Sequence, residues 1–157
     1  MISHRKSGAV TASLVLLAFF ATGVAEASEC KNINADITST FANGPGCTSP
    51  VGICTTGNMA SGLLRGTTSF TALALATAPA QSTLAYAGSL SISTDQGTVT
   101  ISDVGVLDQI NLVFSEVDRI TSGTGRFSGA TGVLFISGNQ TATGFEGKVT
   151  GEICLVQ

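Results

Sequence analysis

Hydrophobic and polar residues alternate along most of the chain beyond residue 28. Between Asn32 and Phe41, for example, Ile33, Ala35 and Ile37 share one parity and polar residues share the other. A period of two places successive side chains on opposite faces of an extended strand. The alternation recurs in segments separated by short runs rich in Gly, Asn, Asp or Pro: 69–78, 82–94, 98–106, 111–120, 132–138 and 143–155.

About eight short strands at this spacing predict an antiparallel barrel or sandwich. Segment 69–78 is rich in Ala and Leu, but it alternates and follows the β-favouring Gly66–Thr68, so we predict a strand there as well. The two terminal strands favour the barrel. Cys30 and Cys154 share the polar parity of these strands, and a bridge between them would join the seam of a closed sheet. We therefore expect an all-β fold: a single closed antiparallel barrel of eight strands, which leaves no exposed edge.

The first residues have the pattern of a targeting segment. A basic start at 4–6 precedes an apolar run over 8–24, and Ala25-Glu26-Ala27 follows. This arrangement predicts a secretory signal peptide over 1–27 and a barrel domain over 28–157. The alternative is a retained membrane anchor, but the run is marginally short and the Ala-x-Ala exit argues against it. We expect a secreted or periplasmic (extracytoplasmic) protein with no membrane span after signal removal.

Four cysteines, an even number, remain in 28–157. In an exported chain this number favours two disulfides, for which three pairings are possible. Cys47 and Cys54 flank a short loop with Pro and Gly that a bridge would close, and this leaves Cys30 with Cys154. The alternative is a four-cysteine metal site. Because the spacing contains no C-x₂-C pair, we expect disulfides Cys47–Cys54 and Cys30–Cys154 and no metal site.

Composition excludes several functional classes. The single histidine, His4, lies in the predicted signal peptide, so 28–157 has no imidazole for a Ser-His-Asp or Cys-His mechanism or a histidine zinc site. The chain has a net charge of −3 and no basic cluster. Since nucleic-acid binding requires concentrated positive charge, we expect no nucleic-acid partner.

The glycine-rich stretch SGTGRFSGATG, Ser122–Gly132, invites comparison with nucleotide-binding loops. Its glycines follow G-x-G-x-x-x-G and precede the strand-like VLFIS, whereas a dinucleotide fingerprint is G-x-G-x-x-G at the start of a helix. Gly-Lys-Ser/Thr is also missing. We therefore expect no cofactor, and we interpret the stretch as a crossing of the barrel end in which Phe127 plugs the interior.

The longer stretch ITSGTGRFSGATGVLFISG resembles the glycine-rich segment of the allene oxide cyclase-like and dirigent-like barrels. Ser122 stands where the first glycine of that segment is usual, and the matching residues are Gly123, Thr124, Gly125, Arg126, Phe127, Ala130 and Gly132. CTSPVGICTTG and TGEICL also look like uncharacterised exported bacterial members. The resemblance implies a calycin-type eight-stranded barrel, often oligomeric, whose cavity binds hydrophobic small molecules. Some relatives guide cyclisation or radical coupling without a cofactor.

Candidate functional residues lie at apolar parity within the predicted strands. Asp103 shares parity with Ile101, and Glu116 and Asp118 share parity with Leu112, Phe114 and Ile120. A carboxyl group on an apolar face loses hydration, which raises its pKa and suits it to proton transfer. Two arginines have the charge to hold such a carboxylate ionised or to bind an anion, and Tyr86 offers a phenol. The candidate ligand-binding residues are Asp103, Glu116, Arg119, Arg126 and Tyr86.

Each candidate also has a purely structural interpretation. Asp103 would cap a turn at the barrel rim, Glu116 would pair with Arg119 or Arg126, and Tyr86 would fill the core with its hydroxyl at the surface. Two functional hypotheses follow. One is a secreted barrel that binds a small hydrophobic molecule, in one version as a cofactor-free isomerase or cyclase. The alternative is a non-catalytic carrier, envelope or interaction module whose interior is packed by Phe114, Phe135 and Phe145.

Overall fold

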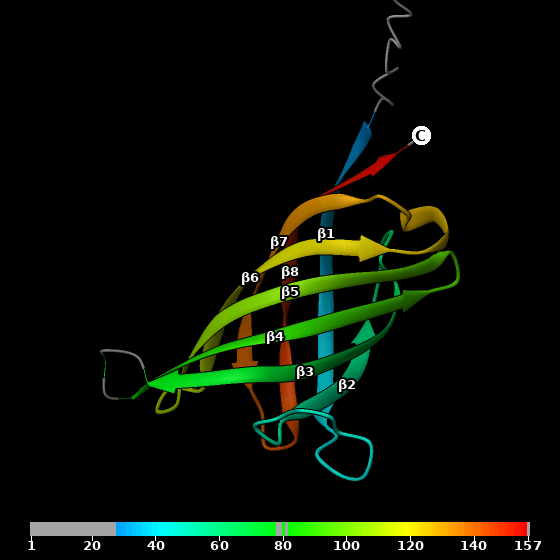
Figure 1. Ribbon diagram of the computed structural model, residues 1–157. Helices are drawn as coiled ribbons and strands as arrows, with labels where there is room; N and C mark the ends of the chain where they lie inside the picture. Colours follow the sequence, from blue (N-terminus) through cyan, green and yellow to red (C-terminus); the bar gives the residue numbers. More distant parts are fainter. Residues whose placement is uncertain (1–27, 78–79, 81, 157) are drawn as a thin grey trace, which may run out of the picture.

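The computed structural model describes residues 28–77, 80 and 82–156, and the predicted signal peptide lies outside them. Figure 1 shows this part of the chain as a β-barrel. Its elements, within the described residues, are β1 (Ser28–Phe41), β2 (Cys54–Met59), β3 (Gly66–Thr77), β4 (Thr83–Thr94), β5 (Gly97–Asp108), β6 (Val113–Gly123), the 3₁₀ turn η1 (Gly125–Phe127), β7 (Thr131–Gln140) and β8 (Gly144–Val156).

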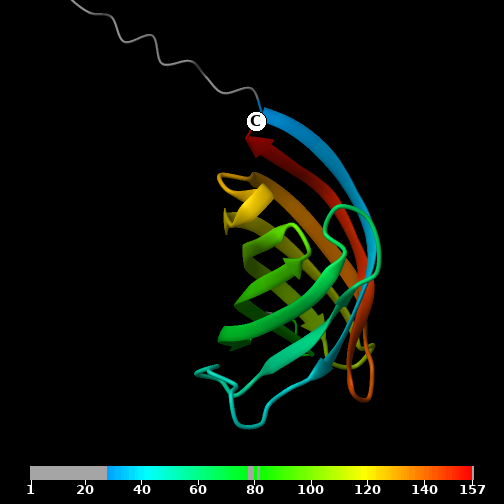
Figure 2. The same cartoon turned by 90° about the vertical axis from the view of Figure 1, so that its right-hand side faces the viewer.

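Every strand pairs antiparallel with the next, and β8 pairs with β1 to close the sheet. The closing register runs from Ser28 opposite Val156 to Thr40 opposite Gly144. Figures 1 and 2 both show β1 and β8 side by side along the barrel wall, with the two described chain ends together. The predicted closed antiparallel barrel of eight strands is confirmed.

Both predicted disulfides are present. Cys30 and Cys154 lie directly opposite each other on β1 and β8, with their Cα atoms 3.9 Å apart. Cys47 and Cys54 close the loop before β2, with a Cα–Cα distance of 5.7 Å. Since structural disulfides persist in oxidising surroundings, these bonds indicate an oxidising, extracytoplasmic compartment.

Strand β2 was not among the strands predicted individually. Its sequence CTTGNM lacks an apolar alternation, because of the three alternate positions Thr55, Gly57 and Met59 only Met59 is hydrophobic. Gly57 lets β2 approach β1, since a Cβ atom there would lie 1.9 Å from the carbonyl oxygen of Thr38. Tertiary pairing thus makes a strand where the local pattern is weak.

The glycine-rich stretch crosses one end of the barrel between β6 and β7, as predicted. Phe127 of η1 is fully buried and belongs to the hydrophobic core, whose other fully buried members include Met59, Leu64 and Ile153. Gly125 has φ +57°, and a Cβ atom there would lie 2.3 Å from the carbonyl oxygen of Gln96. The glycine therefore serves a tight backbone crossing between β6 and β7.

The opposite end of the barrel carries the loops after β1, β5 and β7 (Figure 1). The loop after β5 corrects one sequence interpretation. Leu112 precedes β6, has φ +57° and is 43% exposed, so it does not share the inner face with Phe114. Phe135 is 52% exposed and faces outward, so it does not pack the interior.

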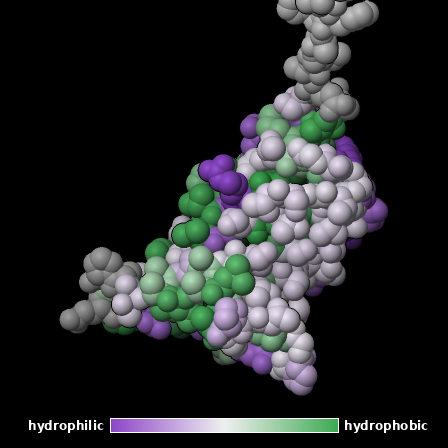
Figure 3. Space-filling view, viewed as in Figure 1, coloured by the Kyte–Doolittle hydropathy of each residue, from purple (hydrophilic) through white to green (hydrophobic). Residues whose placement is uncertain are grey.

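The barrel exterior carries exposed hydrophobic side chains. Figure 3 shows them gathered over β3 and its neighbours, where Leu73 is exposed. Val104, Val117 and Phe135 lie in one transverse row across β5, β6 and β7 and are also exposed. Among the described residues, no helix has the length and hydrophobicity to cross a membrane.

Candidate functional site

Two transverse rows of inward-facing residues on β4, β5 and β6 form the site. Gly88, Asp103 and Asp118 are register partners in the first row. The second row, two residues along each strand, contains Tyr86, Gly105 and Glu116. Alternation along the strands turns all of these positions toward the interior, so the site is built by register within one curved sheet.

Tyr86 reaches across Gly105 to Glu116. Its hydroxyl donates a 2.6 Å hydrogen bond to Glu116 Oε1. A Cβ atom on Gly105 would lie 2.5 Å from Tyr86 Cζ and 2.8 Å from Glu116 Cγ, so the absence of a side chain creates the space for this bond. The phenol hydroxyl therefore points inward, contrary to the structural interpretation that placed it at the surface.

The two aspartates are more deeply buried than Glu116. Asp103 is 1% exposed and Asp118 is fully buried. One carboxylate oxygen each from Asp103, Glu116 and Asp118 lies within 4.8 Å of the other two, and we call these residues the carboxylate cluster. Asp103 Oδ1 and both oxygens of Asp118 have no hydrogen-bond partner among the described residues. Buried polar atoms are usually paired, so these oxygens need an explanation.

Neither predicted arginine joins the cluster. Arg119 faces outward from β6, because it follows the inward-facing Asp118, and it is exposed. Arg126 lies on η1 at the closed end, where its Nη1 donates a 2.6 Å hydrogen bond to Gln96 Oε1. Within the part of the chain that the structure describes, the ion pairs are Lys31–Glu29 and Lys148–Asp36, both at the surface. The expected pairing of Glu116 with an arginine is therefore wrong, and so is a rim position for Asp103, which lies within β5.

Burial controls the protonation of the cluster. It raises the pKa of Asp103 to about 9, and the charges of Glu116 and Asp118 add to this effect. Burial and then Glu116 raise the pKa of Asp118 to about 8. Burial raises the pKa of Glu116 to about 7, although the Tyr86 hydrogen bond opposes the shift. The pKa of Tyr86 rises far above its ordinary value because of burial and the nearby Glu116, so the phenol remains a donor.

A partly open cavity of about 100 Å³ borders the cluster. Asp103, Glu116 and Tyr86 contribute polar atoms to its wall. The rest is mainly apolar and includes Ala72, Leu84, Leu107, Phe114, Ile136 and Phe145. Phe114 and Phe145 stack edge to face with ring centroids 5.4 Å apart and form one side of the cavity without filling it. The interior is thus hollow beside the polar wall and solid at the η1 end.

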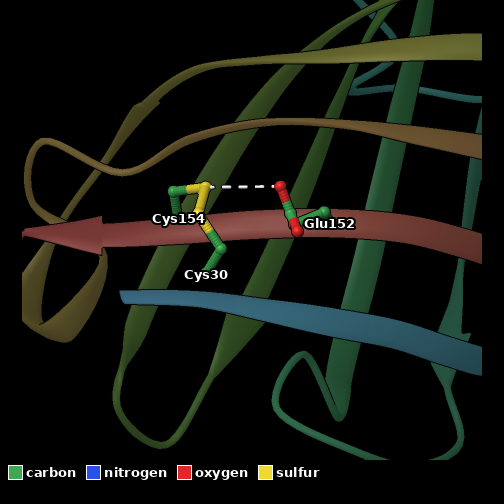
Figure 4. A group of neighbouring side chains, drawn as sticks. All are labelled: Cys30, Glu152 and Cys154. Carbon is green, nitrogen blue, oxygen red and sulfur yellow. Dashed lines mark hydrogen bonds between the residues drawn. A yellow bond between two sulfur atoms is a disulfide. The ribbon is translucent and has the colours of Figure 1, made fainter. Parts of the chain in front are cut away.

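A second group of side chains that could in principle hold a metal consists of Glu152 and the disulfide Cys30–Cys154, which joins β1 to β8 at the seam of the barrel (Figure 4). Glu152 Oε1 lies 3.6 Å from Cys154 Sγ. Both sulfur atoms are consumed in the Cys30–Cys154 bond, so they carry neither a hydrogen to donate nor a thiolate charge to bind a metal. This group is structural.

The structure thus brings together three of the five predicted candidates, Tyr86, Asp103 and Glu116, and leaves Arg119 and Arg126 outside. Asp118 was missing from the candidate set. Its shared parity with Glu116 was a usable signal, since two carboxyl groups at i and i+2 on a strand face the same side.

The chain matches no protein-family model and no curated protein. The resemblance of the glycine-rich stretch to allene oxide cyclase-like and dirigent-like barrels therefore stays a prediction, and the function must be argued from the site.

Proposed function

We propose that this protein is an exported barrel that binds a small, largely hydrophobic molecule in the cavity beside Tyr86, Asp103 and Glu116. The observation that carries the proposal is an apolar cavity with convergent polar groups on one wall, the usual composition of a small-molecule site. Export is supported by the basic-apolar-small pattern of residues 1–27 and by the two disulfides.

The dimensions of the cavity define the ligand class. An apolar cavity of roughly 150 Å³ holds benzene in another protein, so about 100 Å³ suits a compact group of only a few heavy atoms or the apolar end of a longer molecule. The Glu116 carboxyl group and the Tyr86 hydroxyl on the cavity wall favour a ligand with one oxygen function, which a protonated carboxyl group can hydrogen-bond.

A catalytic version of this function is a cofactor-free isomerase or cyclase. Glu116 is the residue best placed to move a proton, since it lines the cavity while Tyr86 fixes one of its oxygens. The carboxylate takes a proton from a carbon of the ligand and returns it at another position, so no external oxidant or reductant is needed.

Native mass spectrometry of protein purified from its own source tests the binding proposal. We expect an adduct of a small molecule, which Ala72→Leu removes because Ala72 is buried in the cavity wall. Ala74→Leu is the matched control on the exposed face of the same strand and should retain the adduct. A ligand-free protein, or equal adducts in both variants, would refute the proposal.

The exterior favours a second candidate, a non-catalytic interaction module. The exposed transverse row Val104, Val117 and Phe135 forms an apolar strip suited to a second copy of the chain. Light scattering after size exclusion is expected to show an oligomer that Val117→Glu dissociates; a monomeric wild-type protein would reject this candidate.

A further inference from the structure

The carboxylate cluster has more acceptor atoms than the protein supplies with donors. Asp118 is fully buried, and neither of its oxygens has a partner among the described residues. Asp103 is 1% exposed and has one such oxygen. The described donor at the cluster is the Tyr86 hydroxyl, which serves Glu116 alone. A buried acceptor without a partner costs about 1–3 kcal/mol, more if charged, so three such oxygens at one place call for a missing electropositive partner.

Among the residues that the structure describes, no basic side chain lies beside the cluster to fill this role. The register partners on β7 are apolar: Leu134 lies opposite Asp118 and Ile136 lies opposite Glu116. On β4, the partner of Asp103 is Gly88, which has no side chain. The positions that face the carboxylates are therefore hydrophobic or empty, and the candidate arginines of the sequence face elsewhere.

The geometry points to a divalent cation. We propose that Asp103, Glu116 and Asp118 form a binding site for one hard divalent cation of the calcium class. Two independent observations carry this proposal: three carboxylate oxygens lie within 4.8 Å of one another, and buried oxygens aimed into this space lack partners. Oxygen ligands at about 2.3–2.6 Å from one Ca²⁺ are separated by no more than roughly 5 Å, which matches the cluster.

The donor chemistry selects the metal class. Carboxylate oxygens suit Mg²⁺, Ca²⁺ and Mn²⁺. Copper(I) and iron–sulfur clusters prefer thiolate ligands, but the four cysteines of the described residues form disulfides and offer no thiolate. Ca²⁺ tolerates irregular coordination, whereas Mg²⁺ demands near-octahedral geometry at about 2.0–2.1 Å. Three carboxylates from two neighbouring strands of one curved sheet form an irregular set of ligands, which favours Ca²⁺.

Asp103 and Glu116 line the cavity, and Asp118 does not. A cation therefore reaches the cluster through the cavity and meets Asp118 at its inner side. This inference goes beyond the proposed binding of a small molecule and does not depend on it, since cation binding needs no organic ligand.

Calorimetric titration of the chelator-treated, disulfide-bonded protein with CaCl₂ at pH 8 tests the proposal. We expect one ion per chain, a rise in Tm on Ca²⁺ addition, and weaker binding of MgCl₂. Asp118→Asn preserves size while removing a ligand charge, and it should weaken Ca²⁺ binding by at least roughly tenfold.

Two further variants complete the test. Glu116→Gln should weaken Ca²⁺ binding in the same way, because it removes another carboxylate of the cluster. Asp95→Asn removes an equal charge at an exposed turn and should leave the affinity unchanged. No saturable heat and no Tm rise at millimolar Ca²⁺, or equal affinity in wild type and Asp118→Asn, would overturn the proposal.

Discussion

At the scale of single residues, the most consequential side chain is Asp118, because its carboxyl group is fully buried without a hydrogen-bond partner among the described residues. The parity of the sequence already turns it inward with Glu116. What parity does not provide is the register between β5 and β6 that sets Asp118 opposite Asp103. Proximity of charges on different strands depends on that register, so the cluster is a tertiary property.

The buried carboxyl groups make stability depend on pH. Their folded pKa values, about 7 to 9, lie above the ordinary values of 3.8 and 4.5, so folding favours the protonated forms. In chelator-treated protein, this stabilisation is fully present below about pH 4 and is lost as pH rises toward 9. Urea unfolding at several pH values should show the decline.

Asp118→Asn should flatten that decline. At pH 9 we expect the variant to exceed wild type by on the order of 5 kcal/mol in unfolding free energy, since burial raises the pKa of Asp118 from 3.8 to about 8 and each pKa unit corresponds to about 1.4 kcal/mol. Asp95→Asn, at an exposed turn, serves as the control and should keep the wild-type slope. An identical pH dependence in all three proteins would show that Asp118 is ionised at no cost in the folded state.

At the scale of elements, alternation located seven strands, because each carries a regular apolar parity that the barrel interior requires. Strand β2 lacks that parity and exists because β1 and β3 flank it and Gly57 permits close approach. Parity could also have excluded Arg119 from the candidate site, because its position next to Asp118 turns its side chain outward. Parity could not exclude Arg126 from the candidate site, because this residue lies in a 3₁₀ turn and not in a strand.

The seam between β1 and β8 gives an element-scale prediction. Cys30 and Cys154 are 124 residues apart in sequence, whereas Cys47 and Cys54 are 7 apart. Because a cross-link restricts the unfolded chain more when it closes a longer loop, Cys30→Ala/Cys154→Ala should lower the unfolding free energy by about 2–5 kcal/mol.

Cys47→Ala/Cys54→Ala is the matched control and should cost less. Denaturant unfolding of both double variants at one pH makes the comparison. A larger loss of unfolding free energy in Cys47→Ala/Cys54→Ala than in Cys30→Ala/Cys154→Ala would show that the Cys30–Cys154 disulfide contributes little to closure of the barrel.

At the scale of the whole molecule, the barrel is closed and solid at one end and hollow at the other. The glycine-rich stretch predicted the solid end, because Phe127 follows a tight glycine crossing and plugs the interior. The cavity at the other end could not be predicted from the sequence, since it depends on how side chains such as Phe114 and Phe145 pack across the barrel. Their stacking leaves open the space beside Tyr86 and Glu116 on which the functional proposal rests.

The central claim is that this space takes up a small apolar molecule. An NMR titration with 2-methyl-1-propanol, a compact molecule of a few heavy atoms that bears one oxygen, tests it most directly. We predict saturable shifts concentrated on methyl groups of the cavity wall, such as those of Leu84, Leu107 and Ile136, and their loss in Ala72→Leu but not in Ala74→Leu. Shifts that do not saturate, that spread over the exterior, or that persist unchanged in Ala72→Leu would contradict the account.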